Sequence, residues 1–167
     1  LSTSTRASSR SSASNALMVA MPPMLLVRVS LMVPAAALTR AYRDDNREAI
    51  RFSREVLRDG KCLIMFPEGT RSRSGRLRPF FSGAGVLALE EGVTVIPAAI
   101  WGSQRKLGPI RVAFGDPIDM SDIPAGAKSV RAKEAIHRIQ VAICELIPVV
   151  GGPPQTIPEG EPSLDKY

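Results

Sequence analysis

Two short apolar runs, separated by a turn-rich segment and a helical pattern, restrict the fold of this chain more than any other feature. The runs cover residues 62–66 and 93–100. Between them lies FPEGTRSRSG, Phe66 to Gly75, which is rich in turn-forming residues, and then a helical pattern from about Ser82 to Glu91. Strand, helix and strand with short connections predict a βαβ unit and a parallel strand pair. We therefore predict an α/β fold.

Three further elements are predicted around this unit. A helix should begin at Asp45 or Asn46 and end at Asp59-Gly60, because apolar or small residues recur there at spacings of three and four. Residues 110–114 are expected to form a strand. A last helix is predicted from Lys128 to Leu146, ended by Pro148. The expected buried faces of the first and last helices are Ala49, Ile50, Ser53, Val56 and Leu57, and Ala132, Ile136, Ile139, Ile143 and Leu146.

Composition limits the classes of partner and site. The chain has 167 residues, which suits one domain, and its net charge of +6 favours anionic partners. Aromatic residues make up only 5%, without a stacking pattern, which argues against nucleic acid. Cys62 and Cys144 are expected to be buried, without metal-ligand spacing. His137 is the only histidine, so no metal site is predicted.

The ends of the chain differ in composition from its middle. Residues 1–39 are first Ser-, Thr- and Arg-rich and then apolar, and we expect them to be disordered or out of frame. Prolines and an arginine interrupt the apolar part, which argues against a spanning helix. A signal peptide, with Arg6 and Arg10 before Ala35-Ala36-Ala37, stays open as an alternative. The predicted domain covers residues 40–147, and residues 148–167 are expected to be a disordered tail.

The segment after the first apolar run holds several groups suited to a phosphate. Its arginines are Arg71, Arg73, Arg76 and Arg78. A guanidinium presents a planar fork of donors that matches phosphate oxygens, and the carboxyl edge of strands is where α/β folds bind ligands. Gly69 permits close approach of the backbone, and Glu68 is placed to orient an arginine or a ligand hydroxyl. The alternative is a solvated basic loop in which Glu68 pairs with a nearby arginine.

The block FPEGTRS resembles the signature of the glycerophospholipid acyltransferases, the lysophosphatidic acid acyltransferase family. The order of the surrounding segments is also similar to that family: REAIRFSREVLRDGKCLIM before the block, then GAGVLALEEGV, VIPAAI and GDPIDMSD, followed by a closing helix. The resemblance covers roughly residues 40–147. It implies an incomplete acyltransferase-type mixed sheet flanked by helices.

The resemblance implies acyl transfer in phospholipid biosynthesis. A fatty acyl group would pass from acyl-CoA or an acyl carrier protein, as co-substrate, to a lysophosphatidate or glycerol phosphate acceptor. No other cofactor is implied. By carry-over of the motif, Glu68, Gly69, Thr70 and Arg71 form the acceptor site, with Arg71 on the phosphate. Pro97, in VIPAAI, would shape the acyl-donor side. Arg43 is the best match to an upstream phosphate-binding arginine of the family, with Arg40 as the alternative.

The family's catalytic base is missing from this sequence. Relatives place a His-x-x-x-x-Asp motif well before the FPEGTRS block, whereas residues 1–40 contain no histidine, and Ala142 stands five places after His137. No catalytic residue is therefore predicted. We expect a fragment, or residues 1–38 read out of frame, since they are built largely from Ser, Arg, Ala, Val, Met and Pro. A non-catalytic relative that binds anionic lipid or phosphate remains the alternative function.

The resemblance also implies a place in the cell. The family's acceptors are membrane lipids or their precursors, so we expect a membrane-associated protein at the cytoplasmic face. The net charge of +6 is compatible with docking on anionic lipid.

Overall fold

The computed structural model describes residues 14–21, 46–69, 72, 75–90, 93–102, 109–160 and 162. Three helices and four strands lie in this part of the chain. In chain order they are β1 (Ser14–Met21), α2 (Asn46–Arg58), β2 (Leu63–Met65), α3 (Ser82–Ala88), β3 (Thr94–Trp101), β4 (Arg111–Phe114) and α4 (Lys128–Val149).

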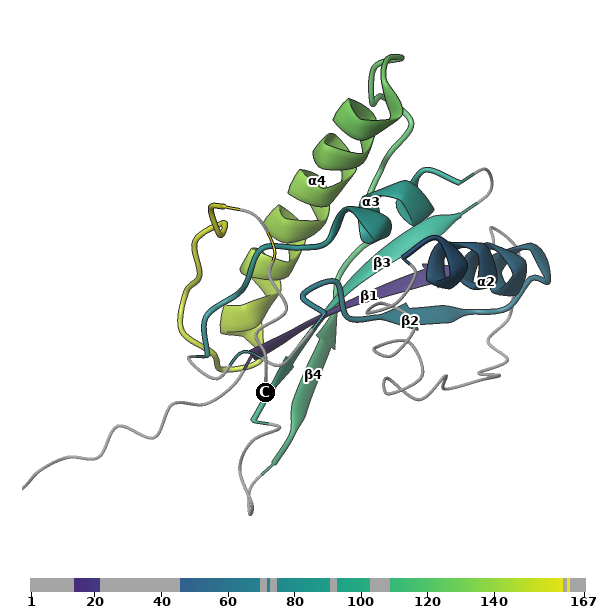
Figure 1. The fold of residues 1–167 in the computed structure, drawn as a ribbon. Helices are drawn as coiled ribbons and strands as arrows, with labels where there is room; N and C mark the ends of the chain where they lie inside the picture. The colour runs from purple at the N-terminus through teal and green to yellow at the C-terminus, as the bar shows by residue number, and fades with distance from the viewer. Residues whose placement is uncertain are drawn as a thin grey trace, which may run out of the picture.

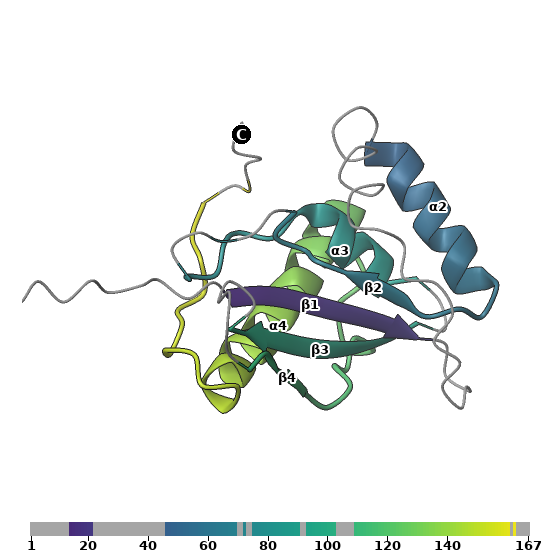
Figure 2. The ribbon, with the colours of Figure 1, turned by 90° about the horizontal axis from the view of Figure 1, so that it is seen from below.

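The strands form one four-stranded sheet in the order β2-β1-β3-β4 (Figure 1). Helices α3 and α4 pack on one face of it, and α2 lies beside the end of the sheet that β2 occupies (Figures 1 and 2). This arrangement confirms the predicted α/β class. None of the described helices is long and apolar enough to cross a membrane.

The predicted parallel pair of β2 and β3 is wrong in one respect. Strand β1 lies between them and is antiparallel to both, so β2 and β3 run in the same direction without being hydrogen-bonded neighbours. Val19 faces Ile64 on one side and Ile96 on the other. The connection through α3 therefore skips one strand position, which a strand from earlier in the chain fills. Strand β4 then pairs antiparallel with β3 at the other side.

Strand β1 corrects the expectation for the start of the chain. Residues 14–21 lie within the segment that we expected to be disordered or out of frame, and no strand was predicted there. Their backbone pairs with three residues of β2 and with eight of β3. The local sequence pattern did not predict this strand, because the partners of β1 are more than 40 residues away in the chain.

Helix α2 forms as its sequence predicts. Its buried face includes Ala49, Ser53, Val56 and Leu57, each under 9% exposed. The helix ends at Gly60, whose φ of +70° is left-handed. There the Lys61 N–H donates to the Val56 carbonyl at 3.1 Å and the Gly60 N–H donates to the Leu57 carbonyl at 3.0 Å, which is the Schellman pattern. The predicted Asp59-Gly60 stop is confirmed.

Helix α4 continues beyond its predicted end at Leu146. Pro148 lies in the last turn, and the helix ends at Val149. A second Schellman pattern follows: the Gly151 N–H donates to the Pro148 carbonyl at 3.0 Å and the Gly152 N–H donates to the Ile147 carbonyl at 2.9 Å. Gly151 has a φ of +87°, which permits this turn.

The core lies between the sheet and helices α3 and α4. Leu87 of α3, Val95 and Ala99 of β3, and Ile139 and Ile143 of α4 are completely buried in it. The two helices cross closely at Gly85, where an added Cβ would lie 2.1 Å from the Ala132 carbonyl oxygen. Only glycine fits at this crossing.

The segment after α4 also departs from expectation. We predicted a disordered tail from residue 148, but its described part, residues 150–160, turns at Gly151 and runs back toward residues 75–80 (Figure 1). The Gln155 side chain hydrogen bonds with the backbone there. This contact joins residues 78 positions apart in the chain, so no local pattern announces it.

Candidate functional site

The candidate site begins where β2 ends. Phe66 and Pro67 leave the strand, and the Gly69 N–H donates to the Phe66 carbonyl at 3.1 Å, which turns the chain at once. Gly69 has a φ of +69°, in the left-handed region that glycine adopts without strain. The glycine expected for close backbone approach is therefore needed for the turn itself.

Two hydrogen bonds close the loop that follows. The Arg78 N–H donates to Oε2 of Glu68 at 3.0 Å, and the Phe81 N–H donates to the Pro67 carbonyl at 2.9 Å. The outgoing limb at residues 67–68 is thereby fastened to the returning limb at residues 78–81. We call residues 68–78 the arginine loop.

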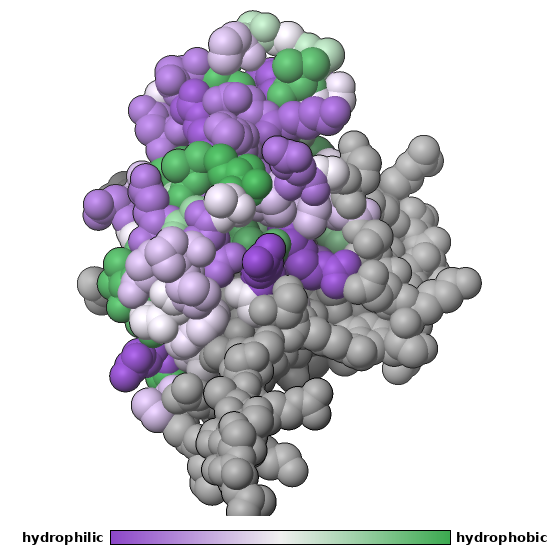
Figure 3. Space-filling view, turned by 90° about the vertical axis from the view of Figure 1, so that its left-hand side faces the viewer, coloured by the Kyte–Doolittle hydropathy of each residue, from purple (hydrophilic) through white to green (hydrophobic). Residues whose placement is uncertain are grey.

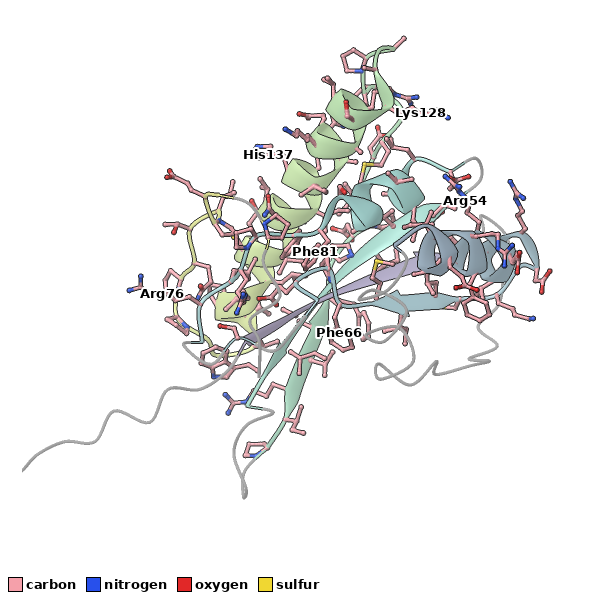
Figure 4. The ribbon with its side chains drawn as sticks, in the orientation of Figure 1. Arg54, Phe66, Arg76, Phe81, Lys128 and His137 are labelled. Atoms are coloured by element: carbon pink, nitrogen blue, oxygen red, sulfur yellow. The ribbon has the colours of Figure 1, made fainter. Side chains whose placement is uncertain are left out.

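Buried residues anchor the arginine loop to the body of the protein. Ser72 is 1% exposed, Leu77 6% and Phe80, just beyond the loop, 4%. Gly75 is also buried, and its φ is +72°. Arg76 is exposed and points away from the molecule (Figure 4). The described part of the loop therefore combines buried anchoring residues with an exposed arginine.

Glu68 lies under the arginine loop rather than on its surface. It is 2% exposed, and it accepts the Arg78 N–H. Its direct contact with an acceptor remains a prediction.

The other predicted acceptor ligands divide between described and undescribed parts of the chain. Gly69 is described and half-buried. Thr70 and Arg71 lie outside the described residues, as do Arg43 and its alternative Arg40. Their roles therefore stay as predicted from the sequence. The structure does place both ends of the segment that contains Thr70 and Arg71.

Pro97 lies within β3 opposite Met18 of β1 and is buried. Its carbonyl accepts the Gly115 N–H at 2.9 Å, and the Val95 carbonyl accepts the Ile118 N–H at 2.9 Å. Residues 116 and 117 bulge between these two bonds. Proline has no N–H to donate to a neighbouring strand, so it fits at this break in the ladder of hydrogen bonds. Pro97 thus shapes the sheet, and its predicted role on the acyl-donor side stays a prediction.

His137 lies on α4, exposed and pointing away from the helix (Figure 4). Across the described ranges, no three His, Cys, Asp or Glu side chains gather in a way that would hold a metal ion.

The two cysteines are less buried than predicted. Cys62, just before β2, and Cys144, on α4, are both half-buried free thiols. Desolvation by burial raises the pKa of both, and the Glu145 charge adds to this at Cys144. A raised pKa leaves less thiolate at neutral pH, so neither residue has the features of an activated nucleophile.

Sequence reasoning missed one residue that contacts the arginine loop. Gln155 accepts the Leu77 N–H at 3.0 Å and approaches the Gly75 carbonyl at 3.4 Å with its Nε2. It lies in the expected disordered tail, where the dense Pro and Gly residues suggested no fixed structure. The two consecutive glycines, Gly151 and Gly152, were the only available signal of a turn back toward the fold.

Comparisons with protein families and with curated proteins both match this chain to acyltransferases. The family model described as Acyltransferase matches residues 13–101, which include β1 as well as the arginine loop. No solved structure gives a significant match.

Three curated relatives carry related names. The chain is 33% identical over 97 residues to "1-acyl-sn-glycerol-3-phosphate acyltransferase BAT2, chloroplastic" of Brassica napus, a match that covers 52% of this chain and 28% of the relative. It is 35% identical over 105 residues to a 1-acyl-sn-glycerol-3-phosphate acyltransferase of Limnanthes douglasii, covering 58% and 34%. It is 32% identical over 114 residues to "1-acyl-sn-glycerol-3-phosphate acyltransferase LPAT1, chloroplastic" of Arabidopsis thaliana, covering 62% and 32%. The matched part thus spans about a third of the length of these relatives.

Proposed function

Because this chain belongs to the acyltransferase family, we propose that it takes part in phospholipid synthesis by acyl transfer to a lysophosphatidate-type acceptor. The names of its relatives, 1-acyl-sn-glycerol-3-phosphate acyltransferases, support this acceptor class. The observation that carries the proposal is the arginine loop itself. It lies within the family match, follows a strand end and is closed by Glu68.

The proposed reaction transfers the acyl group from a thioester to a hydroxyl. The acceptor hydroxyl oxygen attacks the thioester carbonyl of acyl-CoA or an acyl carrier protein, an ester bond forms, and the carbon–sulfur bond breaks. The hydroxyl proton passes to a base, and the thiolate leaves and is protonated to the free thiol. In the proposed site Arg71, on the loop, binds the acceptor phosphate, since a guanidinium matches two phosphate oxygens at once.

The remaining site residues have proposed roles of different kinds. Glu68 and Gly69 set the backbone path that presents Thr70 and Arg71 to the acceptor. Arg43, or Arg40, would supply a second cation for the phosphate. Pro97 would shape the sheet on the acyl-donor side. We propose a membrane-associated protein at the cytoplasmic face, which the net charge of +6 supports.

A second candidate function is binding without turnover. The sequence contains no His-x-x-x-x-Asp motif, and its single histidine is exposed on α4. A general base contributes about 10²- to 10⁴-fold in rate, so a chain without one would retain the acceptor site but transfer acyl groups slowly. The two candidates share the arginine loop and differ in whether free CoA is released.

Two measurements on the 167-residue chain separate these candidates. The first is the dissociation constant for sn-glycerol 3-phosphate and for lysophosphatidate, by calorimetry, in wild type, Arg71→Ala and Arg58→Ala. Arg58 is exposed in the last turn of α2. Arg58→Ala therefore removes the same charge as Arg71→Ala, but outside the arginine loop. We expect Arg71→Ala to weaken binding about tenfold or more, and Arg58→Ala to leave it unchanged.

The second measurement is the release of free CoA from acyl-CoA in the presence of lysophosphatidate. Release supports an enzyme, whereas binding without release supports the alternative. Absence of both would refute the acceptor site, and equal binding by Arg71→Ala and wild type would refute the role of Arg71.

A further inference from the structure

The segment after α4 is built to reach the arginine loop. The Schellman turn at Gly151 reverses the chain, and Gly152 then passes close to α4 and β3. A Cβ on Gly152 would lie 2.6 Å from Cγ2 of Ile147 and 2.9 Å from Cε3 of Trp101. Pro153 and Pro154 follow and restrict the backbone to an extended path. Gln155 comes next, so two glycines and two prolines in succession determine the path by which it reaches the loop.

The Gln155 side chain uses both ends of its amide on the loop. Its Oε1 accepts the Leu77 N–H at 3.0 Å, and its Nε2 donates to the Gly75 carbonyl at 3.4 Å. Nε2 also donates to the Pro153 carbonyl at 3.1 Å, within its own segment. The amide of glutamine offers an acceptor and a donor on one side chain. Gln155 therefore substitutes for a paired strand along two loop residues.

The arginine loop is consequently fastened at two places. Close to the strand, Glu68 holds the Arg78 N–H, and the Pro67 carbonyl holds the Phe81 N–H. Farther along, Gln155 holds Gly75 and Leu77. Thr70 and Arg71 lie in sequence between these fastenings. Gln155 thus adds two hydrogen bonds to a loop that the burial of Ser72, Gly75 and Leu77 also holds.

The loop limb and the returning segment lie side by side at the surface (Figures 1 and 2). Figure 3 shows this side of the molecule, where the described surface is mainly hydrophilic with separate apolar patches. Beneath this surface, Leu77 and Phe80 of the loop limb and Val150 before the turn belong to the same buried apolar core. The two amide hydrogen bonds are the specific connection between them.

We propose that Gln155 is a positioning residue for the acceptor site: it holds the arginine loop in the conformation that presents Thr70 and Arg71. This inference rests on the proposed function. A loop that is ordered before binding does not lose that conformational entropy when the ligand binds, so its affinity is higher. Loss of the Gln155 contacts should weaken acceptor binding without removing any group that touches the acceptor.

The test compares the unchanged 167-residue chain with Gln155→Ala, Gln155→Glu and Gly152→Ala. Gln155→Ala removes both contacts. Gln155→Glu keeps an acceptor for the Leu77 N–H but has no donor for the Gly75 carbonyl. Gly152→Ala moves the segment by crowding Ile147 and Trp101, and leaves the amide intact. Arg138→Ala is the control for general stability, because Arg138, on α4, pairs with Asp122, which precedes the helix, and with Glu134 of the same helix.

The readouts are the dissociation constant for sn-glycerol 3-phosphate, the melting temperature, and the hydrogen exchange of the Leu77 amide. We expect Gln155→Ala to bind about tenfold more weakly and to exchange the Leu77 amide faster. Gly152→Ala should show the same changes, and Gln155→Glu smaller ones at Leu77. Arg138→Ala should lower the melting temperature while the dissociation constant stays that of wild type.

Each outcome decides between the proposals. If the wild type binds and Gln155→Ala binds equally well, the positioning role is wrong while the proposed function stands. If affinity merely follows the melting temperature across all variants, Arg138→Ala included, Gln155 is a stabilising contact only. If the wild type does not bind sn-glycerol 3-phosphate or lysophosphatidate, the proposed function fails, and the positioning role fails with it.

Discussion

At the scale of single residues, Glu68 is the side chain on which the arginine loop depends. A carboxylate that is 2% exposed has lost most of its hydration, and this cost must be offset by hydrogen bonds. The Arg78 N–H supplies one of them at 3.0 Å. The sequence predicted that Glu68 orients an arginine or a ligand hydroxyl, and the structure adds a contact that was not predicted, with a backbone N–H of the returning limb.

Replacing Glu68 should therefore act through the fold of the loop. We expect Glu68→Ala to lower the free energy of unfolding by about 1–3 kcal/mol, because the partly buried Arg78 N–H loses its acceptor. Glu68→Gln keeps an oxygen and should cost less. Urea unfolding followed by circular dichroism measures both. Glu145→Ala, an exposed acid on α4, serves as the control and should stay within about 0.5 kcal/mol of wild type.

Asp122 is a second residue with a defined electrostatic partner. The Arg138 guanidinium donates to both of its carboxylate oxygens, and these hydrogen bonds hold the pKa of Asp122 below its usual range. Because the folded-state pKa is the lower one, the stabilisation is present above the unfolded-state pKa of about 4 and is lost as the pH falls through the folded-state value.

The pH dependence of Asp122→Asn should follow from this sign. The stability advantage of wild type over Asp122→Asn, measured as the urea midpoint, is expected at pH 6 and should shrink below about pH 4. In an Arg138→Ala background the same substitution should have little pH-dependent effect. An advantage that grows on acidification would contradict the assignment of the partner.

At the scale of elements, Gly85 determines how closely α3 and α4 pack where they cross. At Gly85 the backbone of α3 lies close to α4. A Cβ added there would lie only 2.1 Å from the Ala132 carbonyl oxygen. The crossing therefore depends on a missing side chain, although glycine lowers helix propensity. Helix packing therefore explains Gly85, the second glycine of the segment GAGVLALEEGV.

Gly85→Ala should separate the two helices. We expect a loss of about 1–3 kcal/mol in unfolding free energy, because the methyl group collides with backbone that cannot move independently of α4. Gly126→Ala is the matched control, since a Cβ there would meet nothing within 4 Å. Equal stabilities for the two variants would mean that the helices are not in contact as described.

At the scale of the whole molecule, β1 connects the two halves of the sheet. Strands β2 and β3 pair only through it among the described strands, so the arginine loop after β2 is linked to the main core through a strand from the start of the chain. Helix α2 adds a contact of its own, since Arg54 pairs with Glu90 after α3 at 2.6 Å. That pair is partly exposed and contributes at most about 1 kcal/mol.

A proline in β1 should test this linkage. Val19 lies between Ile64 and Ile96, and we expect Val19→Pro to cost about 3 kcal/mol or more by removing a ladder donor and distorting the strand. Lys128→Pro is the control, because Lys128 is the first residue of α4 and proline is tolerated at that position. Circular dichroism and urea unfolding measure both. A wild-type-like Val19→Pro would mean that β1 is not the central strand.

The sequence by itself determined those parts of the protein whose causes are local. The helical stripes placed α2, α3 and α4, and Asp59-Gly60 ended α2, because periodicity and left-handed glycines act over a few residues. The motif FPEGTRS marked the loop that the family match includes. Only the tertiary structure decided that β1 separates β2 from β3, and that Gln155 reaches Gly75 and Leu77. The strand pairing joins backbone groups, and the Gln155 contacts join a side-chain amide to backbone groups. Both connect residues far apart in the chain, so no local pattern in the sequence identifies the partner.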